Sequence, residues 1–180
     1  MAESIVFLSQ KGDRVKEFWN VVRVAIGTSF WLGYTPLMPG TAGALPGVVI
    51  YVFIALTTEG LLQTLLIVGA LVVTCVLTVA LGPWAEEYWG KKDPGIYVLD
   101  EVAGFLGTVL LFRTPDLLRT ALWAFALTRI IDIIKVFPAR RLEKLPQGIG
   151  ILADDLLSSV YAAILLHVFS RYFPGWFGLS

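Results

Sequence analysis

Charged side chains interrupt three stretches of the sequence that are otherwise apolar. They are Asp100 and Glu101 in the first stretch, Arg129, Asp132 and Lys135 in the second, and Asp154 and Asp155 in the third. An ionised group at the centre of a membrane helix costs roughly 2.5–3.5 kcal/mol on insertion scales, so such residues are functional candidates. Carboxylate oxygens bind Mg²⁺ jointly with a substrate phosphate, and Arg and Lys side chains hold phosphate oxygens. These residue types therefore predict a metal-assisted reaction at a phosphoryl group.

The composition places these charges in a membrane protein. Of the 180 residues, 57% are hydrophobic and 16% are charged, and the mean hydropathy is +0.76. A soluble domain carries about 25% charged residues, and here the apolar residues form long runs, which indicates lipid as the solvent. The net charge of zero gives no electrostatic basis for binding nucleic acid. Cys75 is the only cysteine, so a disulfide within the chain is excluded.

The apolar runs predict an all-α fold, a polytopic membrane helix bundle with about four to five membrane-embedded helices. The candidate runs are residues 45–58, 61–82, 96–112, 117–137 and 150–172. Residues 11–26 alternate charged and apolar positions at helical spacing, which predicts an amphipathic helix at the membrane surface or one packed on the rest of the protein. We therefore expect an N-terminal amphipathic segment at 1–27 and a membrane-embedded domain at 28–173.

Basic residues indicate how the helices cross the membrane. With a cytoplasmic N-terminus and five crossings, ten basic residues fall on or near the cytoplasmic side: Lys11, Arg14, Lys16, Arg23, Lys91, Lys92, Lys135, Arg140, Arg141 and Lys144. Only Arg113, Arg119 and Arg171 fall opposite, and a cytoplasmic excess is the usual bias. In this orientation the three charged clusters and the PGTAG turn share one membrane depth, open to the cytoplasm. Within the second cluster, the i, i+3, i+6 spacing predicts a single helical stripe.

Other side chains narrow the chemistry. His167 is the only histidine and lies far along the chain's last apolar run, so a histidine-dependent nucleophile and a His-rich zinc site are excluded. No GxxxxGK[ST] or GxGxxG loop is present, so nucleotide use has no support. Attack on phosphorus by water with a metal's help, or by a carboxylate, remains. The alternatives from other classes are a carboxylate-lined ion or proton transporter and a non-catalytic membrane scaffold.

Three sequence blocks, taken in order, carry a resemblance to a known family. They are PGTAGALP (39–46), DPGIYVLDEVAG (93–104) and TRIIDIIKVFPARRLEKLPQGIGILADDLLSS (128–159). The set resembles the phosphatidylglycerophosphatase A family, metal-dependent membrane phosphatases of bacterial phospholipid synthesis. The resemblance implies a Mg²⁺-dependent lipid phosphomonoester hydrolase that converts phosphatidylglycerol phosphate to phosphatidylglycerol at the cytoplasmic face of the bacterial inner membrane. Ala44, Val136 and Ser158–Ser159 depart from the family's usual residues, so the lipid headgroup is less determined than the chemistry.

The residue chemistry and the resemblance together suggest roles for eight residues. Four acidic residues are expected to bind Mg²⁺: Asp100, Glu101, Asp154 and Asp155. Asp132 is expected to bind the metal or to position the attacking water. Lys135 and Arg129 are expected to neutralise charge on the phosphoryl group, and Thr41 stands in the matching PGTAG turn. That turn is able to bring backbone N–H groups to a phosphate, although its glycines equally suit a sharp turn into the next helix.

Overall fold

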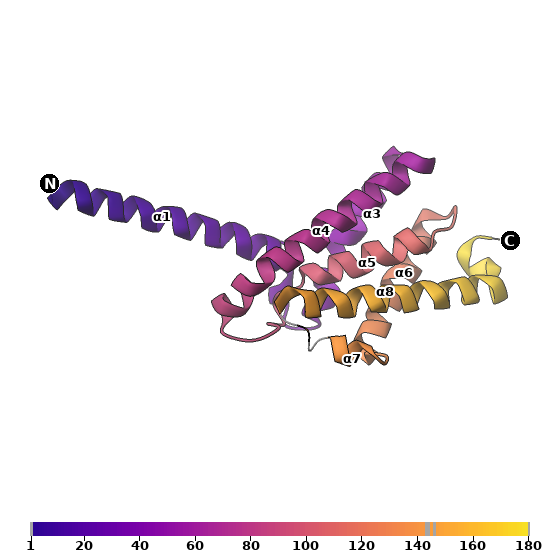
Figure 1. Ribbon diagram of the computed structural model, residues 1–180. Coiled ribbons are helices and arrows are strands. Elements are labelled where there is room, and N and C mark those ends of the chain that lie inside the picture. Colours follow the sequence, from indigo (N-terminus) through magenta and orange to yellow (C-terminus); the bar gives the residue numbers. More distant parts are fainter. Residues whose placement is uncertain (1, 143–144, 146, 180) are drawn as a thin grey trace.

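The part of the chain that the structure describes folds entirely into helices and the loops between them (Figure 1). The computed structural model describes residues 2–142, 145 and 147–179, and the side chains of residues 14–139, 141, 142, 145 and 148–179. The elements are α1 (Ala2–Gly27), η1 (Leu32–Tyr34), α2 (Pro39–Gly43), α3 (Leu45–Thr57), α4 (Gly60–Trp89), α5 (Leu99–Leu111), α6 (Leu117–Ile134), α7 (Ala139–Leu142), α8 (Gln147–Tyr172) and η2 (Pro174–Phe177). The predicted all-α fold is confirmed.

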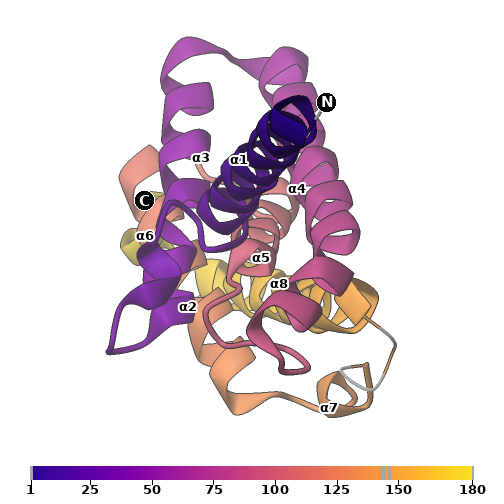
Figure 2. The ribbon, with the colours of Figure 1, turned by 90° about the vertical axis from the view of Figure 1, so that its left-hand side faces the viewer.

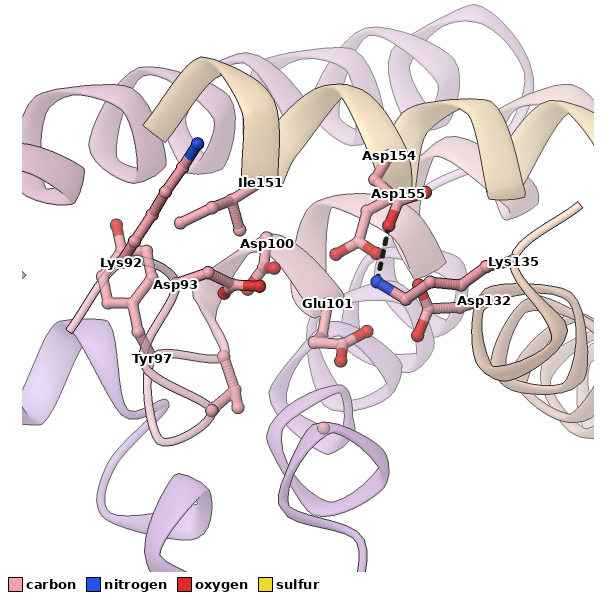
Figure 3. Close-up of a pocket in the computed structure, with 13 residues that line it drawn as sticks. Lys92, Asp93, Tyr97, Asp100, Glu101, Asp132, Lys135, Ile151, Asp154 and Asp155 are labelled. Atoms are coloured by element: carbon pink, nitrogen blue, oxygen red, sulfur yellow. Dashed lines mark hydrogen bonds and ion pairs between the residues drawn. The ribbon is translucent and has the colours of Figure 1, made fainter. Parts of the chain in front are cut away.

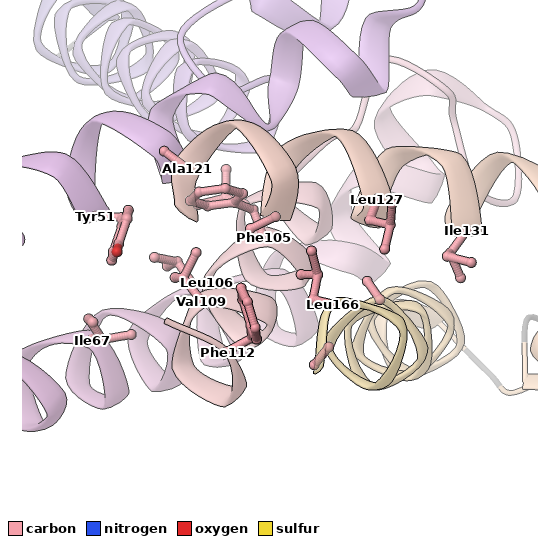
Figure 4. Packing of buried hydrophobic residues seen from close by; sticks show 14 of the residues in the cluster. Tyr51, Ile67, Phe105, Leu106, Val109, Phe112, Ala121, Leu127, Ile131 and Leu166 are labelled. Carbon is pink, nitrogen blue, oxygen red and sulfur yellow. The ribbon is translucent and has the colours of Figure 1, made fainter. Parts of the chain in front are cut away.

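Helix α5 lies at the centre of the bundle, and α3, α4, α6 and α8 pack against it (Figure 2). Ten of its 13 residues are buried, and Phe105, Leu106 and Val109 belong to the main hydrophobic core (Figure 4). A helix that is apolar on every side is stable only when it is enclosed on every side. Asp100 and Glu101 are in the first turn of this helix. Two carboxylates therefore lie at one end of the hydrophobic core.

Three helical stretches of the described chain are long and apolar enough to cross a membrane: Pro39–Thr57, Gly60–Trp89 and Gly148–Tyr172. Large apolar side chains such as Phe53, Val73 and Ile164 are exposed on their outer faces, as expected where lipid is the neighbour. Helix α5 has 13 residues and is therefore about 20 Å long, short of the roughly 30 Å hydrocarbon core of a bilayer. The chain is thus a membrane helix bundle in which α5 is a short central element rather than an ordinary span.

Two helix ends differ from the sequence prediction. Helix α4 continues to Trp89, beyond the end of the predicted run at residue 82, so Glu86 and Glu87 lie in its last turns. Helix α6 ends at Ile134, and Lys135 follows it with a φ of 51°, in the left-handed region. A left-handed residue turns the chain out of the helix. Lys135 therefore leaves the helical stripe that the spacing predicts for it.

Small and hydroxyl-bearing residues bring α5, α6 and α8 close together. A Cβ at Gly107 of α5 would lie 2.7 Å from Oγ of Ser159 on α8. The hydroxyls of Thr108 and Thr128 are 2.7 Å apart, in the buried contact between α5 and α6. Contacts of this kind are the usual means of association between helices in lipid. They hold the three helices that carry the acidic residues at fixed depth against one another.

Helix α1 includes residues 11–26, for which the sequence predicts an amphipathic helix, and it extends away from one end of the bundle (Figure 1). Its end near the bundle contacts α4, where the Arg23 guanidinium lies 5.6 Å from the ring centre of Trp84. Phe18 and Trp19 are exposed. The placement of this segment on a membrane surface stays a prediction. Lys11, Arg140 and Lys144, which the orientation argument uses, lie outside the described side chains.

Candidate active site

One pocket of about 150 Å³ opens where the start of α5, the end of α6, the first half of α8 and the short helix α2 meet (Figure 3). It is lined by Gly40, Lys92, Asp93, Gly95, Tyr97, Val98, Asp100, Glu101, Asp132, Lys135, Ile151, Asp154 and Asp155. Six of the eight residues expected from the sequence are in this lining. Of the other two, Arg129 contacts the lining carboxylates and Thr41 follows the lining residue Gly40. Residues up to 115 positions apart in the chain thus meet at one place.

Three carboxylates from three different helices converge in the pocket. Glu101 of α5, Asp132 of α6 and Asp155 of α8 each offer one oxygen, and these oxygens lie within 4.8 Å of one another. Like charges at this distance in a partly buried site repel one another unless a cation or a proton lies between them. A set of hard oxygen donors at this spacing fits a divalent cation such as Mg²⁺.

Asp100 adds a further buried carboxyl group beside these three. It lies close enough to Asp155 for the two carboxylates to interact electrostatically, and both side chains are buried. Oδ1 of Asp100 and Oδ2 of Asp155 are enclosed, and no described residue donates a hydrogen bond to either. Buried polar atoms normally have a partner. These two oxygens therefore mark a place for a ligand that is positively charged or donates hydrogen bonds.

Arg129 joins two of the three converging carboxylates. Its Nη1 forms an ion pair with Oε2 of Glu101, and its Nη2 lies 3.0 Å from Oδ2 of Asp132. Arg129 and Asp132 are one turn apart on α6, so the helix geometry itself sets the second contact. Both terminal nitrogens of the guanidinium therefore contact carboxylates.

Lys135 forms a further ion pair, with Asp154 of α8. The distance between Lys135 Nζ and Asp154 Oδ2 is 2.9 Å, and Figure 3 shows the lysine side chain reaching across the pocket from the end of α6. Asp154 is buried, whereas the Lys135 side chain is one-third exposed. The three converging oxygens do not include one from Asp154. The neighbouring acidic residues Asp154 and Asp155 thus face different partners.

The PGTAG turn forms the short helix α2, and its backbone lies directly against the charged group. A Cβ at Gly40 would collide with Oε1 of Glu101 and lie 2.9 Å from Nη2 of Arg129. Only a residue without a side chain allows the turn to come this close. Thr41, next in the turn, has an enclosed hydroxyl that makes no hydrogen bond with a described residue.

The loop between α4 and α5 supplies pocket residues that the sequence analysis did not single out, chiefly Lys92, Asp93 and Tyr97. The Tyr97 hydroxyl donates to the Thr78 carbonyl at 2.8 Å, which attaches the loop to α4. Burial raises the pKa of Tyr97 well above its usual range, so the phenol stays protonated and able to donate. Asp93 has a φ of 49°, a conformation that Asp tolerates better than most residues. In the sequence, only the Asp-Pro-Gly turn indicates that this loop bends toward the pocket.

Comparison with known proteins adds a family and several relatives. Residues 25–170 match the family described as Phosphatidylglycerophosphatase A. A Bacteroides thetaiotaomicron protein named "Putative phosphatidylinositol-3-phosphatase" is 40% identical over 154 residues, which are 81% of this chain and 91% of that protein. Proteins named Phosphatidylglycerophosphatase A are 34% identical in Haemophilus influenzae, over 78% of this chain and 84% of that protein, and 26% identical in Escherichia coli, over 87% and 86%. No solved structure matches.

Proposed function

Because the chain belongs to the phosphatidylglycerophosphatase A family, we propose that it hydrolyses phosphatidylglycerol phosphate to phosphatidylglycerol and inorganic phosphate. The observation that carries this proposal is the convergence of Glu101, Asp132 and Asp155 beside two cationic side chains in one pocket of a membrane helix bundle. A phosphomonoester brings two negative charges, which such a pocket binds only if cations balance its own carboxylates.

The proposed cofactor is Mg²⁺, held by Glu101, Asp132 and Asp155. Carboxylate oxygens are the donors that this ion prefers, and the ion usually shares its coordination with substrate phosphate. When bound, Mg²⁺ would polarise the phosphoryl group and lower the pKa of a bound water. The buried oxygens of Asp100 and Asp155 that lack a donor support a cation here.

Three further residues in or beside the pocket have roles in the proposal. Arg129 positions Glu101 and Asp132, since it contacts both. Lys135 lies at the pocket opening, where its ammonium group is able to contact a phosphate oxygen while Asp154 holds it. Gly40 allows backbone N–H groups of the PGTAG turn to approach the same oxygens. In hydrolysis, water attacks phosphorus, its proton passes to a pocket carboxylate, the ester bond to the glycerol oxygen breaks, and that oxygen takes up a proton.

The membrane orientation and the division of the chain are also part of the proposal. The pocket end of the bundle carries Lys91, Lys92 and Lys135, whereas Arg113 lies beyond the far end of α5. This distribution supports a pocket that faces the cytoplasm, in the bacterial inner membrane. We assign residues 28–173 to the membrane-embedded phosphatase domain and residues 1–27 to the amphipathic N-terminal segment.

A second candidate substrate is phosphatidylinositol 3-phosphate, because the relative with 40% identity is named for a phosphatase of this lipid. The size of the pocket bears on the choice. About 150 Å³ is below the roughly 300–1,000 Å³ of common small-molecule sites. A pocket of this size suits the glycerol headgroup better than the bulkier inositol ring.

A transporter is disfavoured by what lies behind the pocket. The core beyond the carboxylates consists of fully buried apolar side chains, among them Phe105, Leu106 and Val109. A path for ions or protons requires polar groups across the whole membrane depth. The pocket instead ends at one side of the bundle, which suits a reaction on a substrate that arrives from that side.

Phosphate release by the purified protein in mild detergent would test the proposal. Release is expected from phosphatidylglycerol phosphate, faster than from phosphatidylinositol 3-phosphate or phosphatidic acid, and only with Mg²⁺. Asp155→Asn should lower turnover by about a hundredfold or more. Asp116→Asn, an equivalent change at the N-terminus of α6, should leave it intact. Absence of release from all three lipids would disprove the phosphatase reaction.

A further inference from the structure

An exposed apolar segment lies between α1 and α2, next to the pocket. We call residues 28–38 the lip. Within it, Phe30, Trp31, Leu37 and Met38 are 68%, 53%, 80% and 58% exposed. Four large apolar side chains clustered at such exposure indicate a non-aqueous neighbour.

The backbone of the lip is held in an unusual shape. Ser29, Phe30 and Trp31 have φ values of 50°, 58° and 66°, and the left-handed region is strained for bulky residues. Nearby groups stabilise the turn. The Thr28 hydroxyl accepts a hydrogen bond from the Trp31 N–H at 3.0 Å, and the Phe30 N–H donates to the Ala25 carbonyl at 2.6 Å. These hydrogen bonds stabilise a strained turn in which the side chains of Phe30 and Trp31 are exposed.

The lip is attached to the loop that leads into the pocket. The Ser29 hydroxyl donates to the Val98 carbonyl at 3.4 Å, and the Val98 N–H donates to the Gly27 carbonyl at 2.9 Å. Gly33 lies so close to the Ile96 carbonyl that no Cβ would fit. Val98 lines the pocket and stands two residues before Asp100. The lip is therefore joined to the loop that leads from α4 to the pocket.

The lip also continues into a lipid-facing surface. The first membrane-crossing stretch begins at Pro39, directly after the lip, and Leu45, Val49 and Phe53 extend the exposed apolar surface along it. On the other side, Trp31 lines a cavity with Tyr34 and with Tyr88 of α4. Aromatic side chains of this kind gather where membrane and water meet. Because the apolar surface of the lip is continuous with that of the membrane-crossing stretch, membrane lipid is the neighbour that covers the lip.

We propose that the lip inserts into the leaflet that holds the substrate and guides a phospholipid from that leaflet into the pocket. This inference rests on the proposed lipid phosphatase function. The acyl chains lie against Leu37 and Trp31, while the phosphomonoester reaches the carboxylates of the pocket. The lip thereby acts on access of membrane-embedded substrate and not on the chemical step.

A comparison of two substrates would test this role. The substrates are long-chain phosphatidylglycerol phosphate in vesicles and its dihexanoyl analogue dissolved as monomers. Leu37→Gln should slow hydrolysis of the vesicle substrate by about tenfold, the effect expected from one lost apolar contact of a leucine, and leave the dissolved substrate unaffected. The control is Leu61→Gln, which changes a leucine of 74% exposure in the first turn of α4 and should alter neither rate. Equal losses on both substrates would overturn the proposal.

A second measurement does not depend on activity. In a Cys75→Ala background, a fluorophore on Leu37→Cys should be quenched by nitroxide groups on lipid acyl chains and poorly by dissolved iodide. The same label on Lys91→Cys, in the exposed loop, should show the opposite pattern. Quenching of the Leu37→Cys label by iodide alone would refute insertion of the lip. If the unaltered protein hydrolysed neither substrate, the proposed function would fail, and this measurement would still decide where the lip lies.

Discussion

Lys135 and Asp154 are 19 residues apart in the chain, yet the distance between Nζ and Oδ2 is 2.9 Å. The contact exists because Lys135 turns out of α6 in a left-handed conformation and reaches α8. Adjacent residues on a helix point roughly 100° apart, so Asp154 and Asp155 serve different partners. Asp154 meets the lysine, and Asp155 meets Glu101 and Asp132.

This division predicts which acidic residues affect metal affinity. Asp132→Asn and Asp155→Asn should raise the Mg²⁺ concentration for half-maximal activity by more than about tenfold, a loss that even a residue supporting a ligand causes. Asp154→Asn should leave that concentration close to its original value. Mg²⁺ titrations of phosphate release would measure it. An equal effect of Asp154→Asn would place Asp154 among the ligands.

The ion pair itself should contribute to stability. Lys135→Met removes a charged donor from the buried Asp154, and we expect a loss of about 1.5–3 kcal/mol in the free energy of unfolding. The double variant Lys135→Met/Asp154→Asn should lose less than the sum of the single losses, because the two residues contact each other. Denaturant titrations in detergent would measure these values, with Lys91→Met as the exposed control. Additive losses would show that the pair does not stabilise the fold.

The closeness of Gly40 to the charged group predicts an activity defect without unfolding. Gly40→Ala places a Cβ against Glu101 and Arg129. Displacement of such groups by about 1 Å costs up to about a hundredfold in rate. The melting temperature should hardly change, because the atoms that must move are the ends of two long side chains. Gly69→Ala adds a Cβ with nothing within 4 Å and serves as the control. Normal turnover in Gly40→Ala would mean that the pocket does not need this close approach.

Two glycines on α5 should respond differently to the same substitution. Gly107→Ala brings a Cβ to 2.7 Å from Ser159 Oγ, whereas the nearest atoms to a Cβ at Gly104 are at an ordinary 3.4 Å. Gly107→Ala should therefore cost about 1–3 kcal/mol through overpacking, partly restored by adding Ser159→Ala. Gly104→Ala should be nearly neutral, since alanine favours a helix more than glycine does. Unfolding experiments on the three variants would reveal whether α5 and α8 pack this closely.

The sequence predicted where the acidic clusters lie but not how they pair. Alternating membrane crossings are enough to bring Asp100, Asp132 and Asp155 to one end of a bundle. The partner of each carboxylate depends on helix phase and on where α6 ends, and the left-handed conformation of Lys135 is set by tertiary contacts that no spacing rule contains. The spacing therefore grouped Lys135 with Arg129, whereas the structure pairs it with Asp154.

The position of the loop from Lys92 to Tyr97 is also not predictable from the sequence pattern. In sequence it is a charged segment with a turn signal, typical of a solvated connection. It folds over the pocket because Tyr97 is buried and reaches a carbonyl of α4. Contacts of this kind join residues 19 positions apart, and periodicity carries no information about them.

The shortness of α5 has a consequence for the access of water to its ends. Asp100 lies at one end of this helix and Arg113 follows the other end. Two ionisable residues are therefore separated by only about 20 Å along the helix axis. Longer helices such as α4 and α8 enclose α5, so they, and not α5, meet the roughly 30 Å of hydrocarbon of a bilayer. At least one end of α5 therefore lies below the membrane surface, and water must descend into the bundle to reach it.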